Sequence, residues 1–105
     1  MNLLNSILIE GEVLADPLFS SLPEGLEYCT FDISAGDTAP AVPVVVYSRL
    51  ALRCSELLSK GSGVRVVGRI TQDPAASEAE GSQKLRVVAE HVEVKPTISR
   101  RVEVA

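Results

Sequence analysis

The sequence predicts an all-β fold in which five strands close into a barrel and one short helix lies between the third and fourth strands. The 105 residues suit a single domain. Apolar residues make up 46% of the chain but aromatics only 4%, so valine and other aliphatic side chains must fill the core, as is common in strands. Two predicted strands also contain a glycine, which favours a strongly bent sheet.

The first predicted strand covers residues 6–14 and contains Gly11. An Asp-Pro pair ends it, and residues 18–26, which contain serine, proline and glycine, indicate a loop. Residues 27–34 alternate between apolar and polar side chains, a pattern typical of a half-buried strand. The side chains expected to point toward the core are Cys29, Phe31 and Ile33.

The third predicted strand covers residues 42–47, and the apolar spacing changes after it. Apolar residues at i, i+4, i+7 and i+8 indicate one face of a short helix: Leu50, Cys54, Leu57 and Leu58. We expect Ser48 to be the N-cap of this helix, Lys60 to lie in its last turn and Gly61 to follow its end.

The fourth predicted strand covers residues 64–72 and contains Gly68, and the fifth covers residues 84–95. Between them lies a polar, acidic loop. Pro96 ends the last strand, so we expect one domain over residues 1–96 and a tail over 97–105. Five strands with a helix between the third and fourth are the OB-fold order. Another small α+β sheet is the main alternative.

The charge balance argues against tight, non-specific binding of nucleic acid. The chain has 14 acidic and 10 basic residues, which gives a formal net charge of −4, although the charges could be segregated onto different faces. An enzyme is also not indicated, because the chain has one histidine and no metal-ligand cluster, phosphate-binding loop or nucleophile motif. We therefore expect no metal and no cofactor.

Cys29 and Cys54 are far apart in the sequence and form no metal-binding or redox motif. We expect both thiols to be reduced, unliganded and buried. Residues 1–13 contain no lysine or arginine, and two glutamates interrupt their apolar run, so they predict neither a signal peptide nor a membrane span. We expect a cytoplasmic protein that does not contact a membrane.

Five segments, taken in order, resemble bacterial single-stranded DNA-binding proteins. They are ILIEGEV at 7–13, PVVVYSRLA at 43–51, CSELLSKGS at 54–62, VRVVGRI at 64–70 and VVAEHV at 87–92. The resemblance implies an OB-fold that binds single-stranded DNA without sequence preference in DNA replication, repair and recombination. It also implies a homotetramer, or a homodimer as in the related primosomal replication protein, with replication proteins as further partners.

Sequence-tolerant binding of single strands requires aromatic side chains for base stacking and cations along the phosphates. The candidate stacking residues are Tyr47, which aligns with a DNA-stacking aromatic of the family, Tyr28 and Phe19. The candidate phosphate-binding residues are Arg49, Arg65, Arg69, Lys84 and Arg86. Arg65 could instead lie at a subunit interface, where the family places that strand face.

The chain departs from the family in ways that would weaken DNA binding. It has no tryptophan, and Ala41 and Ala75 stand about where two family tryptophans would be. The loop before the last strand carries Asp73, Glu78 and Glu80, which would repel phosphate. The alternative interpretation is therefore an OB-fold protein-interaction or assembly module that has lost most DNA binding.

Overall fold

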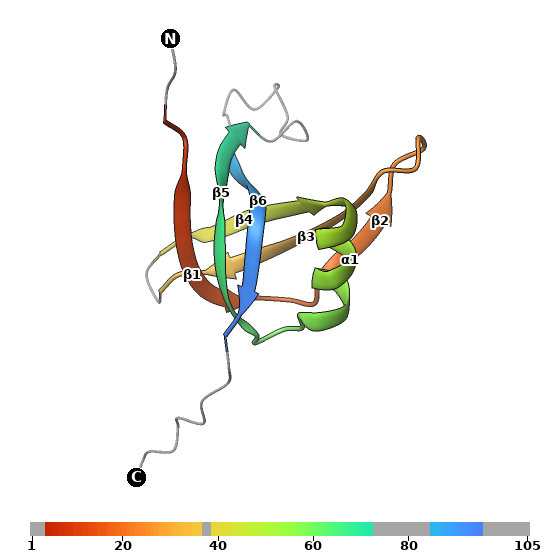
Figure 1. Ribbon diagram of the computed structural model, residues 1–105. Coiled ribbons are helices and arrows are strands. Elements are labelled where there is room, and N and C mark those ends of the chain that lie inside the picture. The colour runs from red at the N-terminus through yellow and green to blue at the C-terminus, as the bar shows by residue number, and fades with distance from the viewer. Residues whose placement is uncertain (1–3, 37–38, 73–84, 96–105) are drawn as a thin grey trace, which may run out of the picture.

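The structure, a computed structural model, describes residues 4–36, 39–72 and 85–95. These residues form six strands and one helix (Figure 1). In chain order the elements are β1 (Ile7–Val13), β2 (Leu18–Ser21), β3 (Glu27–Ser34), β4 (Ala41–Tyr47), α1 (Ser48–Leu57), β5 (Gly63–Gln72) and β6 (Leu85–Val94). The five strands and the helix expected from the sequence are all present within a few residues of their predicted bounds.

Five of the strands close into a barrel. The sheet order is β1-β5-β6-β4-β3-β2, and an additional pairing of β1 with β3 closes the ring. All neighbours are antiparallel except β4 and β6, which pair in parallel through Val44–Val87 and Val45–Val88. The helix connects β4 to β5, packs against β3 and also contacts β2, β4 and β6 (Figure 1). This arrangement confirms the predicted OB-fold.

The strand β2 was not predicted, because residues 18–26 were expected to form a loop. Leu18–Ser21 pairs with the first half of β3, from Leu18 opposite Thr30 to Ser21 opposite Glu27. All four residues of β2 are exposed, so no alternation of buried and exposed side chains marks the strand. Pairing with the edge of β3 forms it, and β2 extends away from the barrel (Figure 1).

The core is aliphatic and lies inside the barrel. The inward-facing residues Cys29, Phe31 and Ile33 of β3 are at most 5% exposed, as their alternation predicted. The other residues of the core cluster come mainly from the other barrel strands and from one face of the helix: Val13, Val44, Val46, Ala51, Cys54, Leu58, Val64, Val66, Val87 and Ala89. Val45 is also buried, on the side of β4 that carries Tyr47. No charged or polar side chain of the described residues is buried with them.

Two glycines allow the strands to cross closely where the barrel bends. A Cβ atom on Gly11 would collide with the carbonyl oxygen of Ser34, and one on Gly68 with the carbonyl oxygen of Val88. The β5–β6 register shifts beside Gly68, which marks a bulge at the same place. The bending role predicted for these glycines therefore has a steric cause.

The start and end of the helix differ from the prediction. Ser48 is not the N-cap; it is the first helical residue, with a φ of 61°, and Tyr47 occupies the cap position without a side-chain hydrogen bond. The helix ends at Leu57, so Lys60 lies beyond its last turn. There the backbone N–H of Lys60 donates to Asp16 Oδ1 at 2.8 Å, which fixes the exit from the helix. Gly61 follows with a φ of 94°.

Candidate nucleic-acid interface

Two tyrosines face each other on the outside of the barrel. Tyr28 on β3 and Tyr47 on β4 are register partners in an antiparallel pair, so their side chains lie on the same face. Both are half-buried. Tyr47 leaves the core side of its strand, because Val44 and Val46, of the opposite parity, belong to the core cluster. This pair provides two adjacent aromatic side chains on one surface.

An arginine from a third strand joins them. The Arg86 guanidinium on β6 donates a hydrogen bond from Nη2 to the Tyr47 hydroxyl at 3.2 Å. We refer to Tyr28, Tyr47 and Arg86 as the tyrosine cluster. Thr71, the register partner of Arg86 on β5, has a buried Oγ1 without a hydrogen-bond partner among the described residues. Sequence reasoning placed Arg86 among the phosphate-binding residues but did not reveal its contact with Tyr47.

Arg49 extends the positive charge near the tyrosine cluster. It follows Tyr47 by two residues and lies exposed in the first turn of α1. Its guanidinium forms no ion pair with any residue that the structure describes. It therefore remains available to an anionic ligand beside Tyr47.

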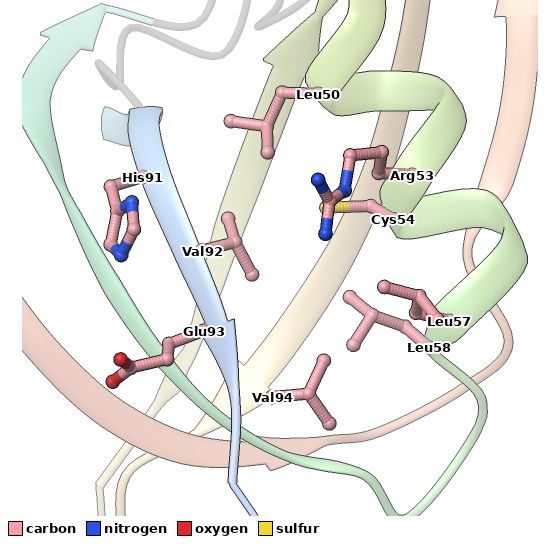
Figure 2. A pocket seen from close by; sticks show the side chains of 9 residues that line it. All are labelled: Leu50, Arg53, Cys54, Leu57, Leu58, His91, Val92, Glu93 and Val94. Atoms are coloured by element: carbon pink, nitrogen blue, oxygen red, sulfur yellow. The ribbon is translucent and has the colours of Figure 1, made fainter.

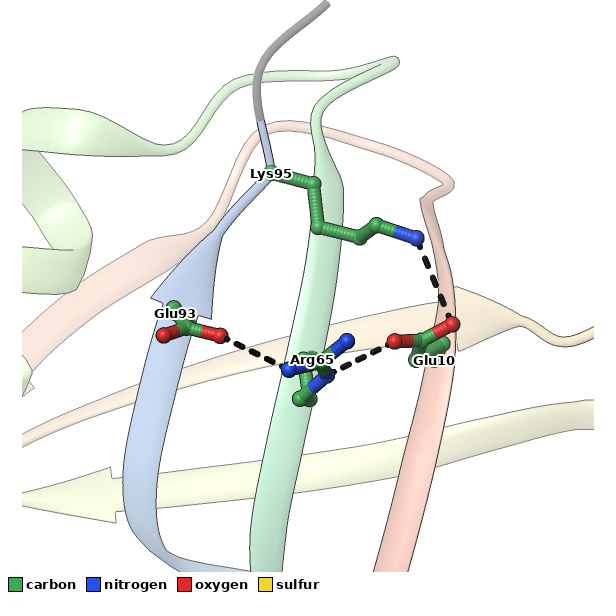
Figure 3. A network of polar contacts seen from close by, with 4 residues as sticks. All are labelled: Glu10, Arg65, Glu93 and Lys95. Carbon is green, nitrogen blue, oxygen red and sulfur yellow. Dashed lines mark hydrogen bonds and ion pairs between the residues drawn. The ribbon is translucent and has the colours of Figure 1, made fainter.

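Arg65 lies near the start of β5 in a network of ion pairs (Figure 3). Its Nε is 2.7 Å from Glu10 Oε2 and its Nη1 is 3.3 Å from Glu93 Oε1. Lys95 Nζ approaches the other oxygen of Glu10 at 3.3 Å. We refer to these four residues as the Glu10 network. The two cations and two carboxylates of the network cancel in formal charge.

The contacts within the Glu10 network also shift ionisation. Hydrogen bonds from Arg65 and Lys95 lower the pKa of the Glu10 carboxyl below its ordinary value. The hydrogen bond to Glu10 likewise raises the pKa of the Arg65 guanidinium. All four side chains are about half exposed, and water screens the attraction within exposed ion pairs of this kind. The main effect of the Glu10 network is therefore to neutralise the charges of Arg65 and Lys95, and its contribution to the stability of the fold is small.

Arg69 shares the outward face of β5 with Arg65, and it is also paired. Its Nε lies 2.9 Å from Glu90 Oε2 on β6. Glutamates from the neighbouring strands therefore pair with both of these candidate phosphate-binding arginines. Sequence reasoning missed these partners because strand register decides which carboxylate stands opposite each arginine, as Glu10 and Glu93 stand opposite Arg65.

Phe19 is separated from the tyrosine cluster. It lies on β2 opposite Cys29, whereas its neighbour Ser20 lies opposite Tyr28. Register partners share a face of the sheet, so Phe19 is on the side of the buried Cys29 and not on that of the tyrosines. It is 41% exposed there. The structure thus does not bring all three predicted stacking residues together.

The remaining predictions concern the family's tryptophan positions, the acidic loop and tail, and metal binding. Ala41 begins β4 and is exposed, so it offers no aromatic surface at a position where the family resemblance implied a tryptophan. Lys84, Ala75 and the acidic loop with Asp73, Glu78 and Glu80 lie outside the described residues, as does the expected tail at 97–105. Within the described residues, no three His, Cys, Asp or Glu side chains gather as a metal site would require.

A groove of about 320 Å³ separates α1 from the end of β6 (Figure 2). Most of its lining is aliphatic. Its residues are Leu50, Arg53, Cys54, Leu57 and Leu58 from the side of the helix and His91, Val92, Glu93 and Val94 from the strand. In Figure 2, Val92 and Val94 point toward the helix, while His91 and Glu93 point away from it. Sequence reasoning did not anticipate this groove.

Both cysteines are free and buried, as expected. Cys29 is fully buried and Cys54 is 3% exposed. Burial raises the pKa of the Cys29 thiol, and burial together with the nearby Cys29 raises the pKa of Cys54 to about 11. Thiols in this state are weak nucleophiles, so neither contributes reactive chemistry to the surface.

A closed OB barrel that presents paired tyrosines and an arginine on its outer face defines a class of small binding domains. Residues 4–95 match the family model described as "Single-strand binding protein family", so the chain belongs to this family. No described helix has the length and apolar character that a membrane crossing demands.

The similar proteins agree with this family. The chain is 27% identical over 101 residues to a protein of Aquifex aeolicus (strain VF5) named "Single-stranded DNA-binding protein", covering 86% of this chain and 69% of that protein. Its fold matches the crystal structure of the wild-type single-stranded DNA binding protein from Thermus aquaticus with a TM-score of 0.76 and 26% identity. A deletion mutant of that protein matches with a TM-score of 0.75 and 26% identity. The matches cover 89% of this chain but only 41% and 42% of the Thermus aquaticus chains.

Proposed function

We propose that this protein binds single-stranded DNA without sequence preference through the tyrosine cluster and Arg49. The observation that carries the proposal is the cross-strand pair of Tyr28 and Tyr47, held beside Arg86 on the outer face of a barrel of this family. Every base has a flat face, so stacking on tyrosine is tolerant of sequence and is worth roughly 1–3 kcal/mol per base. Arg49 supplies charge for the adjoining phosphate.

The binding is expected to be weak for the family. The protein has no tryptophan and a net charge of −4. Arg65 and Arg69 are engaged by glutamates, so a phosphate would have to compete with Glu10, Glu93 or Glu90 for them. If about three phosphates are contacted per protomer, the slope of log affinity against log salt concentration is about −2.

A fluorescence-anisotropy titration with labelled oligo-dT tests the proposal. At about 50 mM salt we expect saturable binding that weakens as salt is added. Replacing Tyr47 by alanine removes one stacking surface and is expected to cost roughly 1–3 kcal/mol, a loss of about fivefold to a hundredfold or more. The matched control is Phe19→Ala, which removes an exposed aromatic from the other side of the sheet and should leave the affinity unchanged.

Two results would contradict the proposal. Undetectable binding at low salt would reject the DNA function. Equal losses in Tyr47→Ala and Phe19→Ala would keep the function but reject the tyrosine cluster as its site.

The free edge of β1 bears on how the protein assembles. β1 pairs with β5 along one edge, and only its end, at Glu12 and Val13, pairs with β3, so the rest of that edge has no strand partner among the described residues. Unpaired edges favour association, and Leu8 on β1 is 65% exposed. We therefore propose a homotetramer, or a homodimer, that acts with replication proteins in cytoplasmic DNA replication, repair and recombination. Light scattering that finds a monomer would reject the assembly.

One observation supports a second candidate function. The aliphatic groove between α1 and β6 has the character of a protein-binding surface, with few charged residues in its lining. An OB-fold interaction module that has lost DNA binding would bind its protein partner in this groove, and its tyrosine cluster would bind no DNA. The titration distinguishes the two functions, because only the DNA function predicts a Tyr47-dependent signal.

A further inference from the structure

The positively charged residues of the described chain differ in whether a carboxylate neutralises them. Arg65, Arg69 and Lys95 each form an ion pair with a glutamate. Arg49 and Arg53, both exposed on α1, form no ion pair with any described residue. They are four residues apart, so they lie on one face of the helix with Cβ atoms about 5–6 Å apart. The helix thus carries positive charge that the protein itself does not balance.

The two exposed arginines of α1 lie between the tyrosine cluster and the groove. Arg49 follows Tyr47 by two residues, and Arg53 lies one turn further along α1. Figure 2 shows the Arg53 side chain reaching from the helix over the space between α1 and β6. One turn beyond Arg53, Glu56 reverses the sign of the charge on the helix. The basic stretch therefore spans the first half of the helix, between Tyr47 and the groove.

The groove beside Arg53 is exposed and aliphatic. No carboxylate from its opposite wall, on β6, neutralises Arg53. Leu57 and Val94 line it and are 56% and 41% exposed, which is high for large aliphatic side chains. The other charged wall residue, Glu93, directs its carboxylate to Arg65 and away from the groove. An anion at Arg53 therefore meets apolar surface beside it and no opposing carboxylate from β6.

We infer that Arg53 is a further phosphate-binding residue and that single-stranded DNA passes from Tyr47 along α1 to the groove. This inference rests on the proposed DNA function. Consecutive phosphates bind Arg49 and Arg53, and the sugar or base between and beyond them covers the exposed aliphatic surface at Leu57 and Val94. Attraction of the phosphate chain by uncompensated cations supplies the sequence-independent part of such binding.

The opposite route, across β5 toward β1, is less favourable. It crosses the Glu10 network, whose four charges cancel and whose arginine already holds two glutamates. A phosphate there would displace a carboxylate from Arg65 and meet the repulsion of the freed charge. The same holds at Arg69, where Glu90 occupies the guanidinium. The single-stranded DNA is thus directed along the side of the barrel that carries α1.

The test compares Arg53→Gln with Lys95→Gln, since each removes one positive charge from an exposed side chain. Affinity is measured by anisotropy for oligo-dT of about five nucleotides, which fills the tyrosine cluster and the first half of α1, and for oligo-dT longer than the roughly 4–16 nucleotides that one OB-fold covers. For the long oligomer, Arg53→Gln should weaken binding by roughly threefold to tenfold and flatten the salt slope by about 0.7. The short oligomer reaches Arg53 but not the groove beyond it, so Arg53→Gln should weaken its binding by no more than that of the long oligomer, and Lys95→Gln should leave both unchanged.

The outcomes separate this inference from the proposed function. If the wild type binds neither oligomer, the DNA function and the path both fail. If the wild type binds and Tyr47→Ala weakens binding, but Arg53→Gln matches the wild type for the long oligomer, only the path is overturned and the groove is left to a protein partner. Equal losses in Arg53→Gln and Lys95→Gln would also overturn it, because they would indicate a general effect of net charge.

Discussion

At the scale of single residues, the tyrosine cluster combines an aromatic side chain with a fixed polar anchor. The Tyr47 hydroxyl accepts a hydrogen bond from Arg86, a residue on a strand that pairs with β4 only at Val44 and Val45. A side chain held in place before binding loses less conformational freedom when a base stacks on it. In the proposed function, Arg86 therefore acts on DNA binding through the position of the Tyr47 ring.

This role of the hydroxyl gives a prediction for Tyr47→Phe. The substitution keeps the stacking ring but removes the acceptor of the Arg86 hydrogen bond. We expect the affinity for oligo-dT to fall by roughly twofold to tenfold, in line with the 0.5–1.5 kcal/mol that fixing a side chain costs. The salt slope should stay unchanged because no phosphate contact is lost. Titrations at several salt concentrations check both, and a flattened slope would instead assign the hydroxyl and Arg86 to a phosphate.

At the scale of elements, residue periodicity predicted most of the barrel. The alternation in β3 identified Cys29, Phe31 and Ile33 as core residues, and all three are buried. The glycines in β1 and β5 predicted bends, and both lie where another strand's backbone passes too close for a Cβ atom. These features are local, because side-chain spacing and backbone freedom can be recognised within one segment of the sequence.

The features that were missed depend on contacts between distant segments. Formation of β2 depends on the edge of β3, and its four exposed residues have no apolar period of their own. The partners of Arg65 come from positions 55 and 28 residues away, through the register of β1 and β6 with β5. The placement of Phe19 on the opposite side from Tyr28 follows from register in the same way. Residue types therefore predicted which residues could bind DNA, but only strand pairing decides which of them share a surface.

The start of α1 gives a prediction about stability. Ser48 has a φ of 61°, in the left-handed region where residues with a Cβ atom are strained by roughly 1–2 kcal/mol. Glycine has no such strain, so Ser48→Gly should raise the free energy of unfolding by up to about 1 kcal/mol despite its greater freedom in the unfolded chain. The control is Ser55→Gly in the interior of the same helix, which should lower it by a similar amount. Urea unfolding measures both, and two changes of the same sign would contradict this account.

At the scale of the whole molecule, the barrel separates charge between its faces. The surface formed by β1, β5 and the end of β6 balances its cations with Glu10, Glu93 and Glu90. The first half of α1, which follows Tyr47, leaves Arg49 and Arg53 exposed to solvent. A chain with a net charge of −4 can thus still present one positive surface to a phosphate backbone. This segregation reconciles the acidic composition with the proposed function.

The buried thiols link the stability of the whole barrel to alkaline pH. Cys54 is 3% exposed in the native protein, and its pKa is raised to about 11 from an ordinary value of 9.0. Below pH 9 the thiol is protonated in both the folded and the unfolded chain, so stability is fully retained. Between pH 9 and 11 only the unfolded chain releases the proton, which favours unfolding. A difference of two pKa units corresponds to a loss of about 2–3 kcal/mol by the upper end of this range.

Urea unfolding of the wild type and of Cys54→Ala between pH 7 and pH 11 checks this prediction. The alanine variant should be less stable at pH 7 because it leaves a small cavity beside Cys29 and the helix, but it cannot ionise at this position. The difference in unfolding free energy between the two proteins should therefore shrink as the pH rises above 9. Ionising tyrosines and lysines affect both proteins alike and cancel in the difference. Parallel curves across the whole range would mean that Cys54 is not held as a neutral thiol in the folded barrel.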